Sequence, residues 1–283
     1  MKKKKLKKPY FSIVTVVKND ESNIQKTIKS IIFQNYRDFE YIVIDGKSTD
    51  NTIKKINTYK NRICHVLSEK DRGIYFAMNK GIKLANGVII VFVNSGDILK
   101  PNALRVVSET FKKNKNFDYV FGTVLRHYTQ ASILKSGVNK KKLLYNFDFA
   151  TSHSAGFFLK SKVFWKHGLL NTRFKHSADY DLYYRLIIKK KIIGGSTSKS
   201  KIIGIVSKGG YSSKVSFINH LLEECNIRVY NKQNIFFVIL IFINAILKFL
   251  VKKLVYWINF SILLFSNHAI EFFIPISNLV NFL

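Results

Sequence analysis

The sequence predicts an α/β fold built on a mostly parallel central sheet. Short apolar runs rich in β-branched residues alternate with stretches whose apolar residues recur at helical spacing, which is the pattern of consecutive βαβ units. The chain has 283 residues, of which 47 % are hydrophobic and 14 % aromatic, so it can bury a sizeable core in one large or two small domains. This composition excludes a disordered polycation, despite a formal net charge of +30.

Strands and helices alternate in the first third of the chain. The predicted strands are Phe11–Val17, Phe39–Ile44, Ile63–Ser68 and Val88–Val93. The predicted helices run from the capping residues Asn19–Ser22 to Phe33, from the cap Asp50 to Tyr59, and over Ile74–Ala85. Because the fourth strand is wholly apolar, it should lie at the centre of a sheet covered on both faces. Ligands of such sheets bind beyond the carboxyl ends of the strands.

The basic charge is typical of proteins that bind nucleic acid, an anionic membrane surface or a phosphorylated substrate. Lys outnumbers Arg by 39 to 8, whereas side chains that clamp phosphates or read bases favour Arg. An AT-rich coding bias explains the Lys excess equally well, because Lys, Ile, Asn and Phe are all abundant. A nucleic-acid partner is therefore not favoured, and a basic nucleic-acid-binding protein is kept as an alternative function.

The N-terminal residues and the cysteines bear on location. Residues 1–9 form a basic tail ending at Pro9, and the apolar residues after it alternate with polar ones, so no signal peptide is expected. Cys64 and Cys225 are far apart and lack the spacing of a metal site, so a reducing compartment is expected.

Carboxylates gather after the predicted strands. The chain has only 17 acidic residues, yet five of them lie in the three segments Asp45–Asp50, Glu69–Gly73 and Asn94–Asp97. Each segment taken singly is an ordinary turn, because Asp and Gly are common turn residues. Together they indicate oxygen ligands for Mg²⁺ or Mn²⁺, a cation that commonly bridges to a diphosphate. A P-loop and a dinucleotide site are disfavoured, because neither GxxxxGK[ST] nor GxGxxG occurs where it would be needed.

Five motifs in order carry a resemblance to a known family. They are Asp45-Gly-Lys-Ser-Thr-Asp50-Asn-Thr, Ser68-Glu-Lys-Asp-Arg-Gly-Ile-Tyr, Val93-Asn-Ser-Gly-Asp97, His153-Ser-Ala-Gly-Phe-Phe and Ala178-Asp-Tyr-Asp-Leu. Over roughly residues 10–190 the chain resembles family 2 glycosyltransferases, in particular those that build bacterial surface polysaccharides such as O-antigen or capsule. The resemblance implies a GT-A fold over residues 10–212 and a nucleotide-diphospho-sugar donor used with Mn²⁺ or Mg²⁺.

The resemblance also implies site residues. Those expected to bind the donor nucleotide are Asp45, Ser48, Asp71, Arg72, Asn94 and Ser95. Asp97 is the expected metal ligand, and Gly96 stands where the family often has a first Asp, so backbone groups near Ser95 would have to replace that carboxylate.

The last motif supplies the candidate base. Asp179 matches the catalytic Asp of the family and would deprotonate the acceptor during direct displacement with inversion, although Ala178 stands where Glu is common. His153 and Asp181 are expected to contact the acceptor or phosphate. Each has an alternative, His153 as an ordinary partly buried residue and Asp181 as a helix cap or partner of an Arg.

Residues 213–283 are predicted to be helical and membrane-associating. A polar helix is expected over Val215–Lys232, followed by the apolar run Ile235–Leu247, which spans about 20 Å and is too short to cross a bilayer. Continuation to Phe265 passes Lys248, Lys252 and Lys253. Lys248 and Lys252 fall in a narrow polar stripe with Asn244, Tyr256 and Asn259, and apart from Lys253 the rest of the surface is apolar, which favours a helix lying in the membrane interface. A bent spanning pair and a buried or dimerisation helix are the alternatives.

The leading prediction is an inverting, hexosyltransferase-like enzyme at the cytoplasmic face of the bacterial inner membrane. Its acceptor would be a saccharide on a polyprenyl lipid, as in the family it resembles. Besides a nucleic-acid-binding protein, a catalytically inactive membrane scaffold of the same fold is an alternative, because Gly96 and Ala178 depart from the family pattern.

Overall fold

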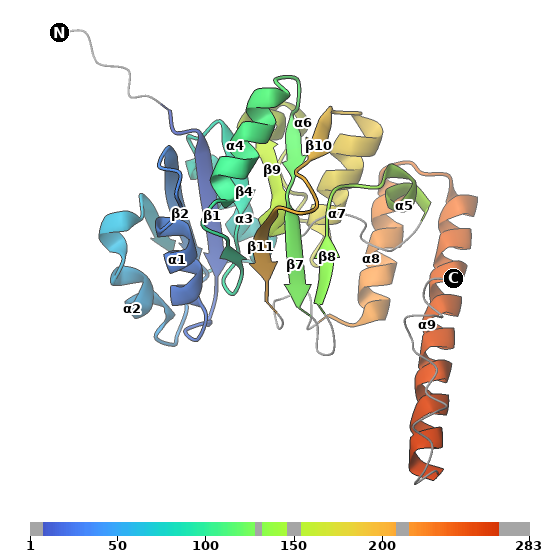
Figure 1. Cartoon of the computed structure of the whole chain (residues 1–283). Helices are drawn as coiled ribbons and strands as arrows, with labels where there is room; N and C mark the ends of the chain where they lie inside the picture. The colour runs from blue at the N-terminus through green and yellow to red at the C-terminus, as the bar shows by residue number, and fades with distance from the viewer. Residues whose placement is uncertain (1–7, 128–131, 146–153, 208–214, 266–283) are drawn as a thin grey trace, which may run out of the picture.

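The computed structural model of the chain describes residues 8–127, 132–145, 154–207 and 215–265 (Figure 1). Within them the strands form a seven-stranded sheet in the order β10-β6-β9-β4-β1-β2-β3 and a four-stranded sheet in the order β5-β11-β7-β8. The larger sheet contains β1 (Phe11–Val17), β2 (Phe39–Asp45), β3 (His65–Ser68), β4 (Ile89–Phe92), β6 (Tyr119–Phe121), β9 (Phe157–Lys160) and β10 (Gly194–Ser196). The smaller sheet contains β5 (Ile98–Leu99), β7 (Thr123–His127), β8 (Ser132–Lys135) and β11 (Ile202–Val206).

Strand direction confirms the predicted fold class. β9 runs antiparallel to β4 and β6, and the other pairs of the larger sheet are parallel. β4 lies between β1 and β9, so the wholly apolar strand is central, as predicted.

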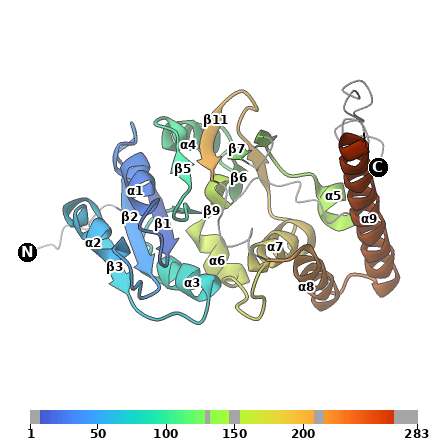
Figure 2. The ribbon, with the colours of Figure 1, turned by 90° about the horizontal axis from the view of Figure 1, so that it is seen from below.

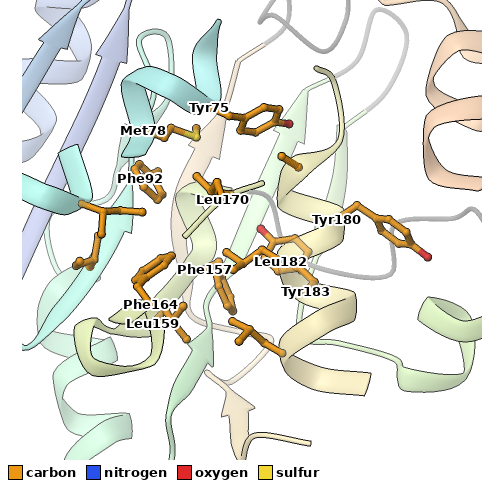
Figure 3. Packing of buried hydrophobic residues seen from close by; sticks show 14 of the residues in the cluster. Tyr75, Met78, Phe92, Phe157, Leu159, Phe164, Leu170, Tyr180, Leu182 and Tyr183 are labelled. Carbon is orange, nitrogen blue, oxygen red and sulfur yellow. The ribbon is translucent and has the colours of Figure 1, made fainter. Parts of the chain in front are cut away.

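Helices cover both faces of the larger sheet, because its strands are apolar on both sides. The helices of the described residues are α1 (Ile24–Ile32), α2 (Thr52–Asn57), α3 (Ile74–Leu84), α4 (Ala103–Lys113), α5 (Lys140–Tyr145), α6 (Ser161–His167), α7 (Ala178–Tyr183), α8 (Phe217–Tyr230) and α9 (Ile235–Phe265), of which α8 and α9 lie beyond the sheet. Single turns of other helix types occur at η1 (Lys60–Arg62), η2 (Ser154–Gly156) and η3 (Tyr184–Lys189). Val14 and Val16 of β1 pack in the core shared with α3, α6 and α7, part of which Figure 3 shows, whereas Phe11 and Ile13 pack in the core shared with α1 and α4.

The predicted elements of the first third are all present, with shifted ends. The largest shift is at α1, which begins at Ile24 and not in the preceding capping residues. Asn19 adopts a left-handed backbone conformation with φ of 50°, which a right-handed helix cannot contain. The third strand begins at His65, two residues later than predicted.

The C-terminal helices stand at one end of the larger sheet. Both views show α7, α8 and α9 following one another away from the sheet (Figures 1 and 2). The rings of Phe217 and Phe249 stack with centroids 4.5 Å apart, so α9 runs antiparallel to α8 and continues beyond its N-terminus. α9 is one continuous helix of 31 residues and is not broken at Lys248, Lys252 or Lys253. By length and composition, its stretch Ile235–Asn259 is able to cross a membrane.

Candidate active site

The segments that follow the parallel strands meet at one edge of the sheet. β1, β2, β3 and β4 are parallel, so their carboxyl ends lie side by side. Ser95, after β4, donates to Asp20 Oδ2, after β1, at 2.6 Å. Ser68, at the end of β3, donates to Asp45 Oδ2, at the end of β2, at 2.6 Å. The structure thus brings the predicted junctions together.

Asp45 closes the turn after β2 and is fully buried. Its Oδ1 accepts the Ser48 hydroxyl at 2.5 Å, and its Oδ2 accepts the Ser48 backbone N–H at 3.1 Å. Two of the predicted donor-binding residues, Asp45 and Ser48, therefore form one unit.

Asp71 forms an ion pair with Lys80 of α3. Lys80 also lies 2.6 Å from Glu69, and its bonds to these two carboxylates outweigh burial and raise its pKa. Asp71 Oδ2 is buried and has no hydrogen-bond partner among the described residues. The neighbouring Arg72 is exposed at the same rim. This arrangement leaves Arg72 as the freer of the two cations for an anionic ligand.

The Asn94–Asp97 loop is anchored by α1 and by the residue after β11. The Gly96 N–H donates to Thr27 Oγ1 at 3.0 Å, and the Ser207 hydroxyl donates to the Gly96 carbonyl. Gly96 has φ of 95°, a conformation that L-residues with a side chain rarely adopt. A Cβ there would meet only Ser207 Cβ at 3.8 Å, so conformation and not space favours glycine. The positive φ therefore explains why glycine stands at position 96, where the family often has the first of two Asp residues.

Asp97 offers a buried oxygen ligand. Its side chain is 5 % exposed, and burial raises its pKa to about 7, against the opposing effects of the Ser207 and Asn94 backbones and of Arg126. Asn94 Oδ1 is buried and has no hydrogen-bond partner among the described residues. Among the residues that the structure describes, no three His, Cys, Asp or Glu side chains lie close enough together to hold a metal ion by themselves. The oxygen donors present fit a hard divalent cation that takes its other ligands from a diphosphate and water.

Asp179 lies in the first turn of α7, across from the Asn94 loop. Its Oδ1 accepts the Tyr75 hydroxyl at 3.1 Å and the Tyr180 N–H at 3.0 Å. The His176 carbonyl lies 2.8 Å from the same Tyr75 hydroxyl, whose single hydrogen is shared between the two acceptors. Burial raises the pKa of Asp179, and the bond from Tyr75 opposes the rise.

A small pocket lies beside Asp179. It has a volume of about 20 Å³, enough for one water, and its wall includes Asp179 and Ser154 among apolar side chains such as Phe92 and Phe157. Asn94 Nδ2 reaches Ser154 Oγ at 3.5 Å. Figure 3 shows Tyr75, Phe92, Phe157 and Tyr183 around this region. The candidate base and the candidate metal loop are therefore related through Ser154, which lines the pocket with Asp179 and contacts Asn94.

Asp181 has a structural role. It is fully buried, lies 3.3 Å from Arg185 Nη2 and accepts Asn231 Nδ2 at 2.8 Å. Residues two apart on a helix point in different directions, so Asp181 turns away from the space that Asp179 faces. These contacts match the alternative, an Arg partner, whereas the expected contact with acceptor or phosphate stays a prediction. His153 lies outside the described residues.

Sequence reasoning missed three residues of the site. Asp20 follows the first strand, so the rule that ligands bind beyond the carboxyl ends of strands could have identified it. The residues around it were instead interpreted as a helix cap. Ser154 lies next to the predicted His153 within the same motif. Tyr75 lies 104 residues from Asp179 along the chain, and no sequence signal connects them.

Comparison with known proteins places this site in a family. The family described as "Glycosyl transferase family 2" matches residues 12–168. A PGL/p-HBAD biosynthesis glycosyltransferase of Mycobacterium bovis (strain BCG / Pasteur 1173P2) is 29 % identical over 181 residues, which cover 62 % of this chain and 69 % of that protein. A hyaluronan synthase of Pasteurella multocida is 25 % identical over 238 residues, which cover 79 % of this chain and 24 % of that protein.

Solved structures share the fold. The crystal structure of S. aureus TarS 1–349 matches with a TM-score of 0.61 at 14 % identity, over 83 % of this chain and 71 % of that chain. The mannosyltransferase PcManGT from Pyrobaculum calidifontis, in complex with GDP-Man and Mn²⁺, matches with a TM-score of 0.60 at 16 % identity, over 85 % and 69 %. The family match covers more than half of the chain and the fold agrees with it, so this protein belongs to glycosyltransferase family 2 and has a GT-A fold.

Proposed function

We propose that the protein transfers a sugar from a nucleotide-diphospho-sugar to an acceptor hydroxyl with inversion, and that Asp179 is the general base. The observation that carries the proposal is the pocket whose wall includes Asp179 and also Ser154, which contacts the Asn94 loop. Structural neighbours solved with UDP-GlcNAc and with GDP-Man support the donor class. The donor nucleotide would bind along the sheet edge at Asp45, Ser48, Asp71, Arg72, Asn94 and Ser95.

The surroundings of Asp179 suit a base. Tyr75 and Tyr180 both donate to Oδ1, which orients the carboxylate and leaves Oδ2 to accept the proton of the attacking hydroxyl. A raised pKa makes the carboxylate a stronger base. Attack from the Asp179 side, with the diphosphate leaving toward the Asn94 loop, inverts the configuration of the sugar.

The leaving diphosphate would be bound at Asp97. This carboxylate, with the amide oxygen of Asn94, would hold Mn²⁺ or Mg²⁺ together with the diphosphate. The cation would supply neutralisation of the negative charge that develops on the leaving group. The complex of PcManGT with Mn²⁺ supports a divalent metal in this fold.

The direction of α9 supports a membrane-bound acceptor. In Figure 1 the arrowheads of β1 and β7 point toward the same end of the molecule as the free half of α9, so the carboxyl edge of the sheet and this helix face one side. Beyond Phe249, α9 extends about 24 Å past its contact with α8. A helix inserted in or lying on a bilayer would bring the site toward the lipid. This geometry fits a polyprenyl-linked saccharide, as in the synthesis of surface polysaccharides such as O-antigen or capsule.

The surface of α9 fits an anionic bilayer. Its large exposed apolar side chains are Ile235, Phe236, Phe237, Ile239, Leu240, Ile243, Leu247, Leu250, Leu254, Trp257 and Ile258. Lys252 and Lys253 are exposed on the same helix, and the chain carries a net charge of +30, which attracts anionic headgroups. We place the protein at the cytoplasmic face of the bacterial inner membrane, held there by α9.

The proposal is tested by a panel of UDP- and GDP-sugars, with and without Mn²⁺, read by thermal shift and by sugar transfer. Asp97→Asn is expected to lose metal-dependent donor binding. Asp179→Asn is expected to bind the donor normally and to lose transfer by about a hundredfold or more. Near-normal turnover of Asp179→Asn would exclude this residue as the base. Failure of the wild-type protein to bind any donor, together with salt-sensitive binding to nucleic acid, would favour the alternative function.

A further inference from the structure

A carboxylate from α8 holds the segment that leads into α7. Glu223 Oε1 accepts the backbone N–H of Lys175 at 2.6 Å, and Oε2 accepts the backbone N–H of His176 at 2.7 Å. Hydrogen bonds from backbone amides to an ionised carboxylate are about twice as strong as neutral ones. Both amides lie just before Asp179, so Glu223 ties the approach to the candidate base to a different helix.

A second contact comes from the same face of α8. His220 lies one turn before Glu223, and its Nδ1 is 3.2 Å from the hydroxyl of Ser177, which is buried. On the opposite side, the Tyr75 hydroxyl of α3 donates to the His176 carbonyl. Residues 175–177 are therefore held between α3 and α8.

This support matters because α7 has no side-chain cap of its own. Ser177 is its N-cap residue, and the Ser177 side chain makes no capping hydrogen bond. The position of the first turn of α7, and with it Asp179, then depends on the contacts of the preceding segment. Side-chain displacements of about 1 Å at a reacting group cost large factors in rate.

We infer that Glu223 and His220 are positioning residues, which place Asp179 for proton transfer by holding residues 175–177. This inference rests on the proposed role of Asp179 as the base. Both residues lie beyond the segment matched by the family, which ends at residue 168. α8 also contacts α9, through the stacked rings of Phe217 and Phe249. The helix that holds residues 175–177 in place is therefore also the helix that contacts the apolar C-terminal helix.

The test uses Glu223→Gln in the full chain. Gln keeps the size and one acceptor oxygen, but its NH₂ group cannot accept the second amide. We expect kcat to fall about tenfold, with the KM for the donor unchanged. Loosening the segment admits water to Asp179, so the acid limb of the kcat–pH profile should move to lower pH. Tyr75, Tyr183 and His220 face Asp179 and are unchanged in this variant. The charge of Glu223 also acts on Tyr75, where it raises the pKa of the hydroxyl, so its removal moves the acid limb in the same direction. Hydrogen exchange therefore distinguishes a change of position from a change of charge.

Hydrogen exchange provides a readout that needs no activity. Peptides covering residues 171–178 should exchange faster in Glu223→Gln than in the wild type. Glu109→Gln is the matched control, because Glu109 is an exposed carboxylate on α4, away from this segment. The control should leave both the exchange of these peptides and kcat unchanged.

The outcomes separate the inference from the proposed function. Unchanged exchange at residues 171–178 would overturn the inference, as would faster exchange with normal kcat. A loss of kcat that only follows the loss of folded protein, with an unmoved acid limb, would also overturn it. If the wild type transfers sugar from no donor in the panel, the proposed function fails, and the exchange data still decide whether Glu223 holds the segment.

Discussion

Replacing Tyr75 by Phe removes the hydroxyl that binds the candidate base. That hydroxyl has one hydrogen, which it shares between Asp179 Oδ1 at 3.1 Å and the His176 carbonyl at 2.8 Å. A hydrogen bond to a charged group contributes about 1.5–3 kcal/mol. Asp179 is only half-buried, and water replaces part of the lost bond, so we take the lower end of this range.

The bond from Tyr75 stabilises the ionised form of Asp179, so its loss raises the pKa of the carboxyl further. About 1.4 kcal/mol corresponds to one pH unit. The acid limb of the kcat–pH profile should therefore move up by about one unit in Tyr75→Phe, and the rate should recover most of its loss at higher pH.

The assay is sugar transfer at saturating donor, measured between pH 5 and pH 9 for wild type and variant. Tyr41→Phe serves as the control, because it removes another buried tyrosine hydroxyl, bonded to Thr15 at 3.0 Å and remote from Asp179. If the acid limb of Tyr75→Phe coincides with that of the wild type, either Tyr75 does not bind the base or Asp179 is not the base.

Four further predictions concern stability and location. Gly96→Ala should lower Tm by about 2–4 °C, because the positive φ costs about 1 kcal/mol with a side chain present; an unchanged Tm would contradict that account. Asp181→Ala should destabilise the fold by about 1.5–3 kcal/mol in urea unfolding, because Arg185 and Asn231 both lose their bond to this buried carboxylate, while Arg185 keeps its bonds to backbone carbonyls. Asp179→Asn should raise Tm near pH 7. Because folding raises the pKa of this carboxyl, its ionisation as the pH increases destabilises the folded state, and Asn does not ionise. A lower Tm of the variant would contradict this sign. Truncation after Asn234 should move the protein from membranes to the soluble fraction and keep donor binding; persistence in membranes would show that α9 is not the anchor.

The position of that truncation depends on the structure. Gln233 accepts from Tyr184 and Arg228 and donates to the Leu144 carbonyl, so a cut that removed it would damage the domain as well as the apolar helix. From the sequence alone a cut just before Gln233 is equally acceptable, because these bonds are not visible there.

The larger part of the fold could be predicted from the sequence. Apolar periodicity identified β1, β2, β4 and α3 because each element is encoded by its own residues. The meeting of Asp45 with Ser68 also followed, since parallel strands end at the same edge of a sheet. The start of α1 was missed because the left-handed conformation of Asn19 has no counterpart in residue type alone.

Local sequence was a weaker guide to the roles of the two carboxylates in α7. Asp179 and Asp181 stand in the same motif, and both were candidates for chemistry. Helix geometry turns them apart, and Asn231, which arrives from 50 residues further along the chain, binds Asp181. A distant partner therefore decided which of the two is structural.

By itself, the sequence determined the α/β class, the edge of the sheet at which the site lies and the apolar character of the C-terminal helix, because periodicity and strand ends are local properties. Only the tertiary structure decided that Tyr75 and Glu223 hold the approach to Asp179, and that α9 projects on the side of the site. Those contacts join segments separated by many residues, and they arise from packing that no local pattern encodes.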